Sequence, residues 1–424
     1  MYEMKNSNIA WIKEIPYNWN ILHVKDGFNI KKSKAQQTNP VVLTLARSGV
    51  KIRDMTNGEG QFATSYFDYN PVSIDDMLLN PMDLISGDNC SLSKVSGVIS
   101  PAYVNLRYKN GFSPEYYKYY FKYQYWCKAF FAHGKGVSFD NRWTINNETL
   151  MKFPLLVPPL ETQKAIANFL DQRCSEIDGI YTDIEKEINI LEEYKKSVIT
   201  EAVTKGLHPD VEMKDSGIEW IGMIPSGWDV KPLKYVVKYN CRTLPENTQH
   251  NYEFDYVDIG SVTYGKGIEH FQRTTFGNAP SRARRIVQKD DVILSTVRTY
   301  LKATAGIPDN ELPIIVSTGF ITLTANKYIN SKYLKYIAQF DAFVSEVECN
   351  SVGVSYPAIN PSEIVKIKII IPPISEQKEI ADYLDAKCSE IDAIISDKKN
   401  QLATLTEYKK SLIYEYVTDK KQIV

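Results

Sequence analysis

Apolar residues recur at steps of three and four along two long segments of the chain, one within residues 157–206 and one within residues 371–420. Such spacing places apolar side chains on one face of an amphipathic helix. The pattern therefore predicts two long helices, each with an apolar stripe. The predicted stripes are Ile166, Leu170, Ile177, Ile180, Ile184, Ile188, Leu191, Tyr194 and Val198 in the first segment, and Ile380, Leu384, Ile391, Ile394, Leu402, Leu405, Tyr408 and Leu412 in the second.

The two helical segments are copies of one another. The run Cys174–Asp178 returns as Cys388–Asp392, and the run Glu193–Ser197 returns as Glu407–Ser411, each 214 positions later. A long solvated helix with an apolar stripe needs a partner, and the chain offers one matching surface, its own second copy. We predict an antiparallel coiled coil that makes the chain pseudo-twofold symmetric. A parallel pairing, with both variable parts at one end, is the alternative.

The repeats divide the chain into variable and constant parts. A proline pair ends a strand-like run and begins each helix, because proline cannot donate within a sheet ladder and suits the first turn of a helix. A related Trp-Ile to Ile-Pro to Trp motif begins at Trp11 and again at Trp220. The predicted domains are a first variable domain at 1–156, a first helical connector at 157–206, a second variable domain at 207–370 and a second connector at 371–424.

Each variable domain has the composition of a mixed α/β structure, which makes the chain α+β overall. Segments rich in β-branched residues predict strands at 41–45, 98–106, 256–259, 292–296 and 314–324. Helices are predicted from Ser113-Pro114 through residue 131 and from Asn330 through residue 347. The tyrosines crowded into the first of these helices suggest base stacking, but at helical spacing they are better explained as a core face.

Composition excludes several classes of protein. No apolar run reaches the length of a membrane span and the first residues lack a signal-peptide core, so we expect a cytoplasmic protein without membrane contact. The 6 cysteines include no Cys-x-x-Cys pair, and the 5 histidines show no ligand spacing. We therefore predict no metal site.

Positive charge is concentrated in the variable domains although the net charge is −1. Such a pattern suits contact with DNA phosphates, although a basic run is more often an ordinary solvated surface. The candidate DNA-binding bases in the first domain are Lys31, Lys32, Lys34, Arg47, Lys51 and Arg53, and those in the second are Arg282, Arg284, Arg285, Arg298 and Lys302.

Two glycine-containing loops are further candidates, because glycine permits close approach to phosphate while serine, asparagine and arginine donate hydrogen bonds. Each loop precedes an Ile-Asn pair at the same offset of 214, and the alternative is a tight turn that returns the chain to the connector. The loop residues that we expect to contact DNA are Lys135, Ser138, Asn141 and Arg142 in the first domain and Ser351 and Ser355 in the second, with Tyr300 beside Arg298.

The duplicated connectors and the Trp motifs resemble those of the specificity subunits of type I restriction-modification systems. The resemblance rests on Pro158-Pro159-Leu160, Ile177-Asp178 and Glu193–Ser197 with their second copies. It implies two target recognition domains, each reading one half of a split, asymmetric site on double-stranded DNA, with the helices setting the spacer. It also implies partners: two modification subunits, which methylate adenine, and the restriction subunits, which translocate DNA and cut it.

No segment carries the motifs of a catalyst. There is no Asn/Asp-Pro-Pro-aromatic tetrad, no cofactor-binding glycine loop and no phosphate-binding loop. We predict no catalytic residue and no cofactor in this chain, so that S-adenosylmethionine, ATP and Mg²⁺ belong to the partner subunits. The alternatives are a stand-alone bivalent DNA-binding regulator and an enzyme in its own right.

Overall fold

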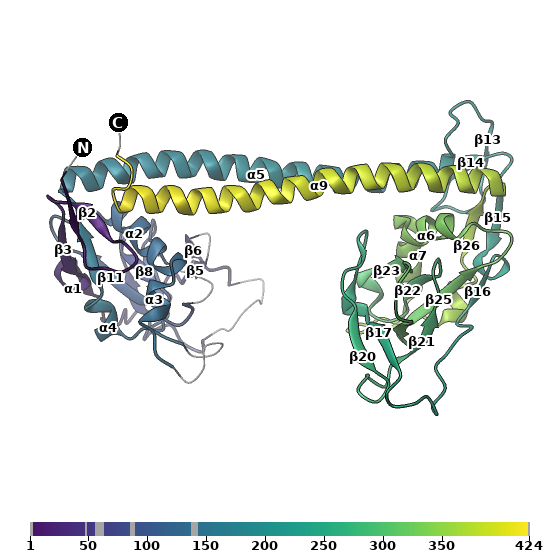
Figure 1. Cartoon of the computed structure of the whole chain (residues 1–424), viewed down its shortest axis with the longest axis horizontal. Coiled ribbons are helices and arrows are strands. Elements are labelled where there is room, and N and C mark those ends of the chain that lie inside the picture. Colours follow the sequence, from purple (N-terminus) through teal and green to yellow (C-terminus); the bar gives the residue numbers. More distant parts are fainter. Residues whose placement is uncertain (1–2, 47–48, 56–62, 85–89, 137–142, 423–424) are drawn as a thin grey trace. The chain divides into compact units, whose positions relative to one another are not determined.

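The computed structural model of the protein describes residues 3–46, 49–55, 63–84, 90–136 and 143–422. The chain forms two compact units (Figure 1). Unit 1 consists of Met1–Glu185 with Lys399–Val424, and unit 2 consists of Lys186–Lys398. The long helices α5 (Leu160–Lys205) and α9 (Ile374–Val417) each contribute one part to unit 1 and the other part to unit 2.

The main sheets of the two units have the same strand order. In unit 1 the order is β4 (Phe28–Ile30), β11 (Val104–Tyr108), β8 (Met77–Leu79) and β9 (Cys90–Leu92), all antiparallel. In unit 2 it is β16 (Val237–Tyr239), β25 (Phe320–Ala325), β22 (Val292–Ser295) and β23 (Thr304–Gly306). Helix α2 (Pro114–Trp126) packs on the first sheet and α6 (Ser331–Gln339) on the second.

A second sheet follows one pattern in both units. Unit 2 has the order β20 (Gln272–Thr275), β17 (Glu253–Val257), β24 (Ile314–Ser317) and β21 (Ala283–Val287), in which β17 and β24 are parallel. Unit 1 has two shorter pairs, β5 (Leu43–Ala46) with β6 (Gly49–Ile52) and β7 (Asn70–Val72) with β10 (Gly97–Ile99). A parallel bridge between Val42 and Val98 joins these pairs. Two divergent sequences therefore adopt one topology.

Short elements complete each unit. The two-stranded antiparallel sheets are β1 (Met4–Asn6) with β2 (Glu14–Pro16), β3 (Asn20–His23) with β12 (Pro154–Val157), β13 (Met213–Asp215) with β14 (Met223–Pro225), β15 (Asp229–Pro232) with β26 (Lys368–Ile371), and β18 (Val262–Thr263) with β19 (Gly267–Ile268). The short helices are α1 (Val24–Gly27), α3 (Ala129–Ala132), α4 (Asn147–Met151), α7 (Asp341–Cys349) and α8 (Pro361–Ile364), with 3₁₀ turns η1 (Leu233–Tyr235), η2 (Ile259–Ser261) and η3 (Thr299–Leu301).

Several predicted elements are divided in the structure. The predicted strands 98–106 and 314–324 each comprise two strands that belong to different sheets, β10 and β11 in unit 1 and β24 and β25 in unit 2. The predicted helix that begins at Ser113 breaks at Lys128, whose φ of 62° is left-handed, and its counterpart breaks at Phe340. Continuous apolar runs cannot reveal such breaks, because both halves of each run are buried.

The tyrosine-rich helix α2 forms a core, as its spacing predicted. The side chains of Tyr116, Tyr117, Tyr120, Phe121 and Tyr125 are all buried, and they belong to the hydrophobic core of unit 1. Burial raises the pKa of the Tyr117 hydroxyl, which donates a hydrogen bond to the carbonyl of Leu156 at 3.0 Å. These rings are therefore unavailable for base stacking.

The helices pair antiparallel in both units, which confirms the predicted coiled coil. In unit 1 the Lys409 ammonium donates to both carboxylate oxygens of Asp178 at 2.6 and 2.8 Å. In unit 2 the repeat equivalents, Lys195 and Asp392, make the same contact at 2.7 and 2.8 Å. Each lysine thus lies opposite the aspartate of the other copy, as antiparallel repeats require.

The buried seam is narrower than the predicted stripe. Ile177, Ile184 and Ile188 are buried as predicted. Ile180 and Tyr194 are exposed, and so are their equivalents Ile394 and Tyr408. A two-helix pair covers a seam with a period of 3.5 residues, so the flanking positions of a wider stripe remain in solvent.

Candidate nucleic-acid interface

A buried glutamine attaches the variable part of unit 1 to its helix. The side-chain oxygen of Gln163, on the first turn of α5, accepts a hydrogen bond from the backbone N–H of Ser113 at 2.8 Å. Its amide nitrogen donates to the carbonyls of Pro158 at 2.8 Å and Gly111 at 3.2 Å. Because the Gln163 side chain is fully buried, these bonds supply the partners that its own polar atoms cannot find in water.

Gln377 makes the same attachment in unit 2. It accepts from the N–H of Asn330 at 2.7 Å and donates to the carbonyls of Pro372 at 2.8 Å and Tyr328 at 3.1 Å. In both units the glutamine thus orders the residues around the start of the helix that packs on the main sheet.

A carboxylate about two turns further along the helix adds a second attachment. In unit 1, Asp171 of α5 accepts hydrogen bonds from the ammonium of Lys118 at 2.5 Å and the hydroxyl of Tyr119 at 2.6 Å. Burial, followed by this bond to the carboxylate, raises the pKa of the Tyr119 hydroxyl. Helix α2 is therefore fixed along α5 at two places.

Asp385 has the same role in unit 2. Its carboxylate accepts from Lys335 at 2.8 Å, from Tyr336 at 2.7 Å and from Lys332 at 2.9 Å. Burial opposes ionisation of this carboxyl, but the three donors outweigh burial and lower its pKa to about 2. The second variable part is thus fastened to α9 by charged hydrogen bonds.

One predicted DNA-binding lysine is committed to the fold of unit 1. The carboxylate of the fully buried Asp76 accepts from Lys31 at 3.2 Å, from Arg107 at 3.1 Å, from Asn105 at 3.2 Å and from the backbone N–H of Ser73 at 2.7 Å. The charge of Lys31 is therefore paired inside the domain.

Unit 2 contains an equivalent acid with different partners. Asp291 precedes β22 as Asp76 precedes β8, and it too is buried. It accepts from the guanidinium of Arg242, from the hydroxyl of Thr324 at 2.7 Å and from the N–H of Gln288 at 2.9 Å. Both domains thus place a buried aspartate at the same position of the topology. The positively charged partners of the two aspartates come from different positions of the chain.

Two loops of unit 2, one with Arg298 and one with Ser355, were predicted separately to contact DNA, and they lie side by side in the structure. The N–H of Arg298 donates to the carbonyl of Pro357 at 2.7 Å, and the N–H of Ile359 donates to the carbonyl of Thr296 at 2.9 Å. The guanidinium of Arg298 lies over the ring of Tyr356, 5.4 Å from its centroid. The structure therefore brings Arg298 and Tyr300, which is half exposed, next to the loop that carries Ser355.

Apolar side chains form the tip of this surface, and the sequence reasoning did not select them. Val354 is 100% exposed, Val352 is 80% exposed and Tyr356 is 70% exposed. The base of the loop is fixed by two backbone hydrogen bonds between Val352 and Ala358, at 2.9 and 3.0 Å. Alternating apolar residues in a segment predicted as a glycine and serine loop were the signal that could have identified them. Such side chains can contact thymine methyl groups or base faces.

Two further candidates in these loops are bonded within the domain. The Lys302 ammonium donates to the hydroxyl of Ser345 at 3.2 Å and lies 4.0 Å from the carboxylate of Glu348. The Ser351 hydroxyl donates to the carbonyl of Val347 at 2.8 Å, which caps the end of α7. Both side chains therefore stabilise the conformation of the loops.

The arginines just before and within β21 have different surroundings. Arg282 is exposed, and its carbonyl accepts from the N–H of Thr318 at 2.8 Å, beside the turn whose Gly319 carbonyl accepts from Thr296. This places Arg282 at the same edge as the two loops. Arg284 lies over the ring of Phe276 at 4.8 Å, and Arg285 is half-buried.

The candidates of unit 1 are more dispersed. Lys32, Lys51 and Lys135 are exposed. Lys34 forms an exposed ion pair with Asp68 at 2.9 Å, and Arg53 is half-buried, with its N–H donating to the carbonyl of Val42 at 2.8 Å. Arg47, Ser138, Asn141 and Arg142 lie outside the described residues.

The described ends of the first loop match those of the second. Lys135 and Thr144 exchange backbone hydrogen bonds at 2.8 and 3.0 Å, as Val352 and Ala358 do in unit 2. The N–H of Ile145 then donates to the carbonyl of Pro81 at 3.0 Å, as Ile359 does to Thr296. The offset of 214 is kept by Thr144 and Ala358 and by the isoleucines that follow them, whereas Lys135 and Val352 are 217 positions apart, so the loops close with the same hydrogen bonds but differ in length.

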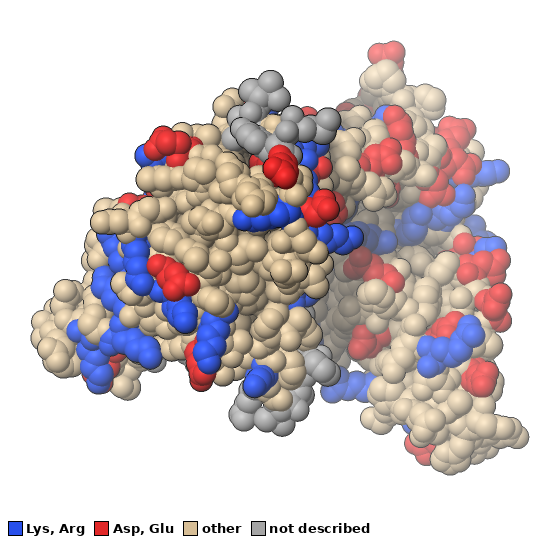
Figure 2. Space-filling view, turned by 60° about the vertical axis from the view of Figure 1, so that its left-hand side comes forward, with Lys and Arg blue, Asp and Glu red and all other residues tan. Residues whose placement is uncertain are grey.

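Charge on unit 1 is mixed rather than uniform. On the face of unit 1 that Figure 2 displays, basic side chains are interspersed with acidic ones.

Among the residues that the structure describes, no group of three or more His, Cys, Asp or Glu side chains could hold a metal ion. None of the described helices is long and apolar enough to cross a membrane.

Comparisons with known proteins show which proteins this chain is similar to. Residues 225–404 match the family model described as the type I restriction modification DNA specificity domain. A solved chain from a study of complex assembly and conformational transition of the type I R-M system has the same fold, with a TM-score of 0.69, 14% identity and coverage of 95% of this chain and 98% of that chain.

Curated relatives agree with this class. The MjaVIII specificity subunit of the type I restriction enzyme from Methanocaldococcus jannaschii is 26% identical over 77% of this chain and 75% of its own length. The EcoBI specificity subunit from Escherichia coli is 21% identical over 97% of this chain and 88% of its own length. The chain is thus similar to the specificity subunits of type I restriction-modification systems, and these comparisons agree with the family that the connector motifs indicated.

Proposed function

We propose that the chain reads a bipartite, asymmetric site on double-stranded DNA for a type I restriction-modification complex. Each unit reads one half-site, and the paired helices set the spacer between the halves. The observation that carries this proposal is the duplication itself. Gln163 and Gln377 attach two variable domains of one topology in the same way, while the loops that face solvent differ.

In unit 2 the reading surface consists of the two adjoining loops and the edge of β21. Arg298, Tyr300 and Arg282 supply charge and hydrogen-bond donors, and Val354 and Tyr356 supply apolar contact. Arginine suits guanine edges and phosphates, and apolar groups suit thymine methyl groups. This combination supports direct reading of bases rather than phosphate contact alone.

A repeated exposed surface on the helices supports docking of two modification subunits. In unit 1, Arg173 donates to Glu176 at 2.9 Å, and this bond, together with the smaller effect of nearby Tyr408, raises the arginine pKa. In unit 2, Lys387 donates to Glu390 at 2.9 Å, and this bond, with a smaller effect of Tyr194, raises the lysine pKa.

The exposed Ile180 and Ile394 continue these two surfaces by helical spacing. Two matching surfaces suit two copies of one partner. The restriction subunits join this assembly, and catalysis, S-adenosylmethionine, ATP and Mg²⁺ belong to the partners.

A methylation map tests the whole proposal. The chain is co-expressed with a modification subunit of its type I system, and modified adenines are located by sequencing. We expect a split motif with a fixed unspecified spacer. A contiguous motif would refute reading by two domains, and sequence-specific binding by the isolated chain without methylation would favour a stand-alone regulator.

Substitutions in unit 2 test which half it reads. Arg298→Ala and Tyr356→Ala should each weaken binding of the complete complex by about 10-fold, since one good base contact contributes about 1–3 kcal/mol. Relaxed specificity should be confined to one half-site in the methylation map. Lys289→Ala, an exposed base of the same domain that pairs with Asp309, is the control and should change neither half.

Matched insertions test the spacer. Seven residues inserted after Lys186 in α5 and after Asn400 in α9, positions 214 apart, keep the apolar seam in phase. They lengthen the pair by about 10 Å, or about three base pairs. The map should show both half-sites unchanged with a longer spacer, and an unchanged spacer would exclude the helices as its determinant.

A further inference from the structure

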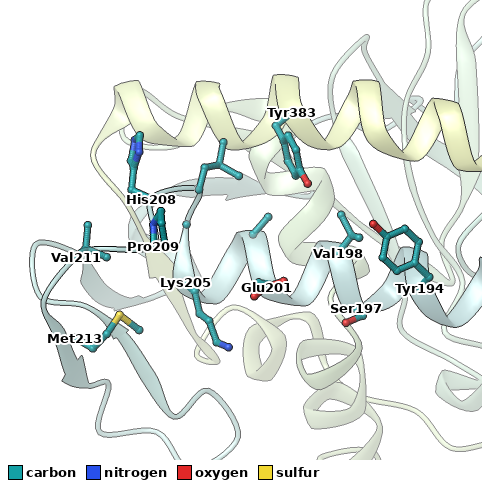
Figure 3. A pocket seen from close by; sticks show the side chains of 13 residues that line it. Tyr194, Ser197, Val198, Glu201, Lys205, His208, Pro209, Val211, Met213 and Tyr383 are labelled. Atoms are coloured by element: carbon teal, nitrogen blue, oxygen red, sulfur yellow. The ribbon is translucent and has the colours of Figure 1, made fainter.

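A groove with a volume of about 880 Å³ lies between the end of α5, the linker that follows it and α9, all within unit 2. Figure 3 shows Tyr383 extending from α9 toward α5, with Val198 and Tyr194 on the facing helix, Val211 on the linker and Met213 at the start of β13. Val198 and Ala202 are buried at its floor, whereas Tyr194 and Tyr383 are exposed in its wall. An apolar hollow bordered by exposed aromatic side chains is a candidate interaction surface.

The repeat shows what covers the equivalent place in unit 1. Phe169 is the counterpart of Tyr383, and Tyr416 is the counterpart of Ala202, at the common offset of 214. The rings of Phe169 and Tyr416 pack together with their centroids 4.4 Å apart. Unit 2 has alanine where unit 1 has a tyrosine, so the ring that covers Phe169 has no counterpart over Tyr383.

Polar groups surround the groove of unit 2. Glu201 and Lys205 line it from α5, and His208 of the linker lies 3.9 Å from the Glu379 carboxylate of α9. The ammonium of Lys387, which donates to the Glu390 carboxylate at 2.9 Å, lies near Tyr194 and Tyr383. An apolar floor with a charged rim is the typical setting of an anchor side chain in a protein interface.

We propose that this groove binds an aromatic side chain of the modification subunit that docks on unit 2. The inference rests on the proposed docking function, because Tyr194 belongs both to the groove and to the repeated exposed surface. The partner's ring takes the place over Tyr383 that Tyr416 takes over Phe169. The two docking surfaces are consequently unequal, with unit 2 holding its modification subunit more tightly than unit 1.

Titration of the full-length chain with its purified modification subunit tests this inference, with each bound state counted by native mass spectrometry. We expect two binding steps of unequal affinity. Ala202→Tyr, which supplies the ring found in unit 1, should weaken the tighter step by about 10-fold, since an aromatic anchor contributes about 1 kcal/mol or more. Tyr416→Ala is the matched variant in unit 1 and should leave the tighter step unchanged.

A second pair of variants changes only exposed side chains, so that neither substitution should disturb folding. Tyr383 is 42% exposed and Tyr239, on an edge strand away from the groove, is 40% exposed. Tyr383→Ala should weaken the tighter step by about 10-fold, and Tyr239→Ala should not change it. Failure of the wild-type chain to bind any modification subunit would overturn the proposed function itself. Two equal binding steps in the wild type, or a tighter step that neither Ala202→Tyr nor Tyr383→Ala weakens, would overturn the groove alone.

Discussion

The two units differ in how strictly they repeat each other. Where the variable domains meet the helices, Gln163 and Gln377 accept and donate the same three hydrogen bonds, and Asp171 and Asp385 both bind a lysine and a tyrosine. Inside the domains, the buried Asp76 and Asp291 hold equivalent places but take their positive partners from different residues. At the loops the correspondence is reduced to backbone hydrogen bonds. The similarity of the contacts in the two units thus declines with distance from the helices. The proposed DNA-reading surfaces are therefore free to diverge.

The largest effect should come from the attachment glutamines. Gln163→Ala and Gln377→Ala should each lower the free energy of unfolding by about 3 kcal/mol, because each leaves buried backbone groups unpaired. The loss should be confined to the unit that carries the change. Hydrogen–deuterium exchange of α2 and α6 measures this directly. Gln172→Ala removes only an exposed bond to Glu176 and should change little, and equal loosening of both units would contradict two separate attachments.

The buried acids should give the next largest effect. Lys31→Met and Arg242→Met should destabilise units 1 and 2 by about 2 kcal/mol each, since a buried carboxylate loses a charged partner. In the Lys31→Met variant Asp76 still pairs with Arg107, and this limits the loss of stability in unit 1. Denaturant unfolding monitored separately in each unit checks the values. Lys32→Met, an exposed neighbour, is the control, and an equal loss there would show that Lys31 has no special structural role.

A pH-dependent difference is expected at the repeat-equivalent positions Asp419 and Lys205. Burial raises the pKa of the Asp419 carboxyl to about 6. The folded state therefore holds this proton more tightly than the unfolded state, and stability falls as pH rises from about 4 to about 6.

Asp419→Asn removes this dependence. It should stabilise unit 1 by less than about 1 kcal/mol above pH 6, because solvent screens the half-exposed site, and should have no effect below pH 4. Melting temperatures across this range measure the difference. The same gain at every pH would exclude titration of Asp419 as its cause.

The smallest effect concerns the reciprocal pairs between the helices. Lys195→Ala and Lys409→Ala should each cost about 0.5 kcal/mol, as expected for ion pairs near the surface. The two losses should be similar, since the contacts have nearly the same geometry. High salt should abolish both, and a loss in only one unit would show that the repeat is not energetically symmetric.

Patterns that recur along the chain were predicted well. The helices, their copies and their antiparallel pairing follow from apolar spacing and from matching surfaces. The core role of Tyr116 and Tyr120 follows from helical periodicity. Exposure of Ile180 and Tyr194 was not predicted, because the sequence gives the width of an apolar stripe but not the width that a partner covers.

The candidate interface was predicted less completely. Arg298 and Ser355 were selected from separate segments, and their proximity depends on backbone bonds that join Thr296 to Ile359. Lys31 was selected for its charge, but whether a lysine is exposed or paired depends on an acid 45 residues away. Val354 was missed because an apolar residue in a loop has no chemical label until its exposure is known.

The sequence by itself determined the duplicated architecture, the long helices and the resemblance to a family, because these are recorded as periodic or repeated local patterns. Only the tertiary structure decided which charges are neutralised inside the domains, which loops adjoin and which of two equivalent helix surfaces keeps an open groove. Those properties depend on pairs of residues such as Tyr383 and Ala202, which are distant in the chain and come together only when the helices pack antiparallel.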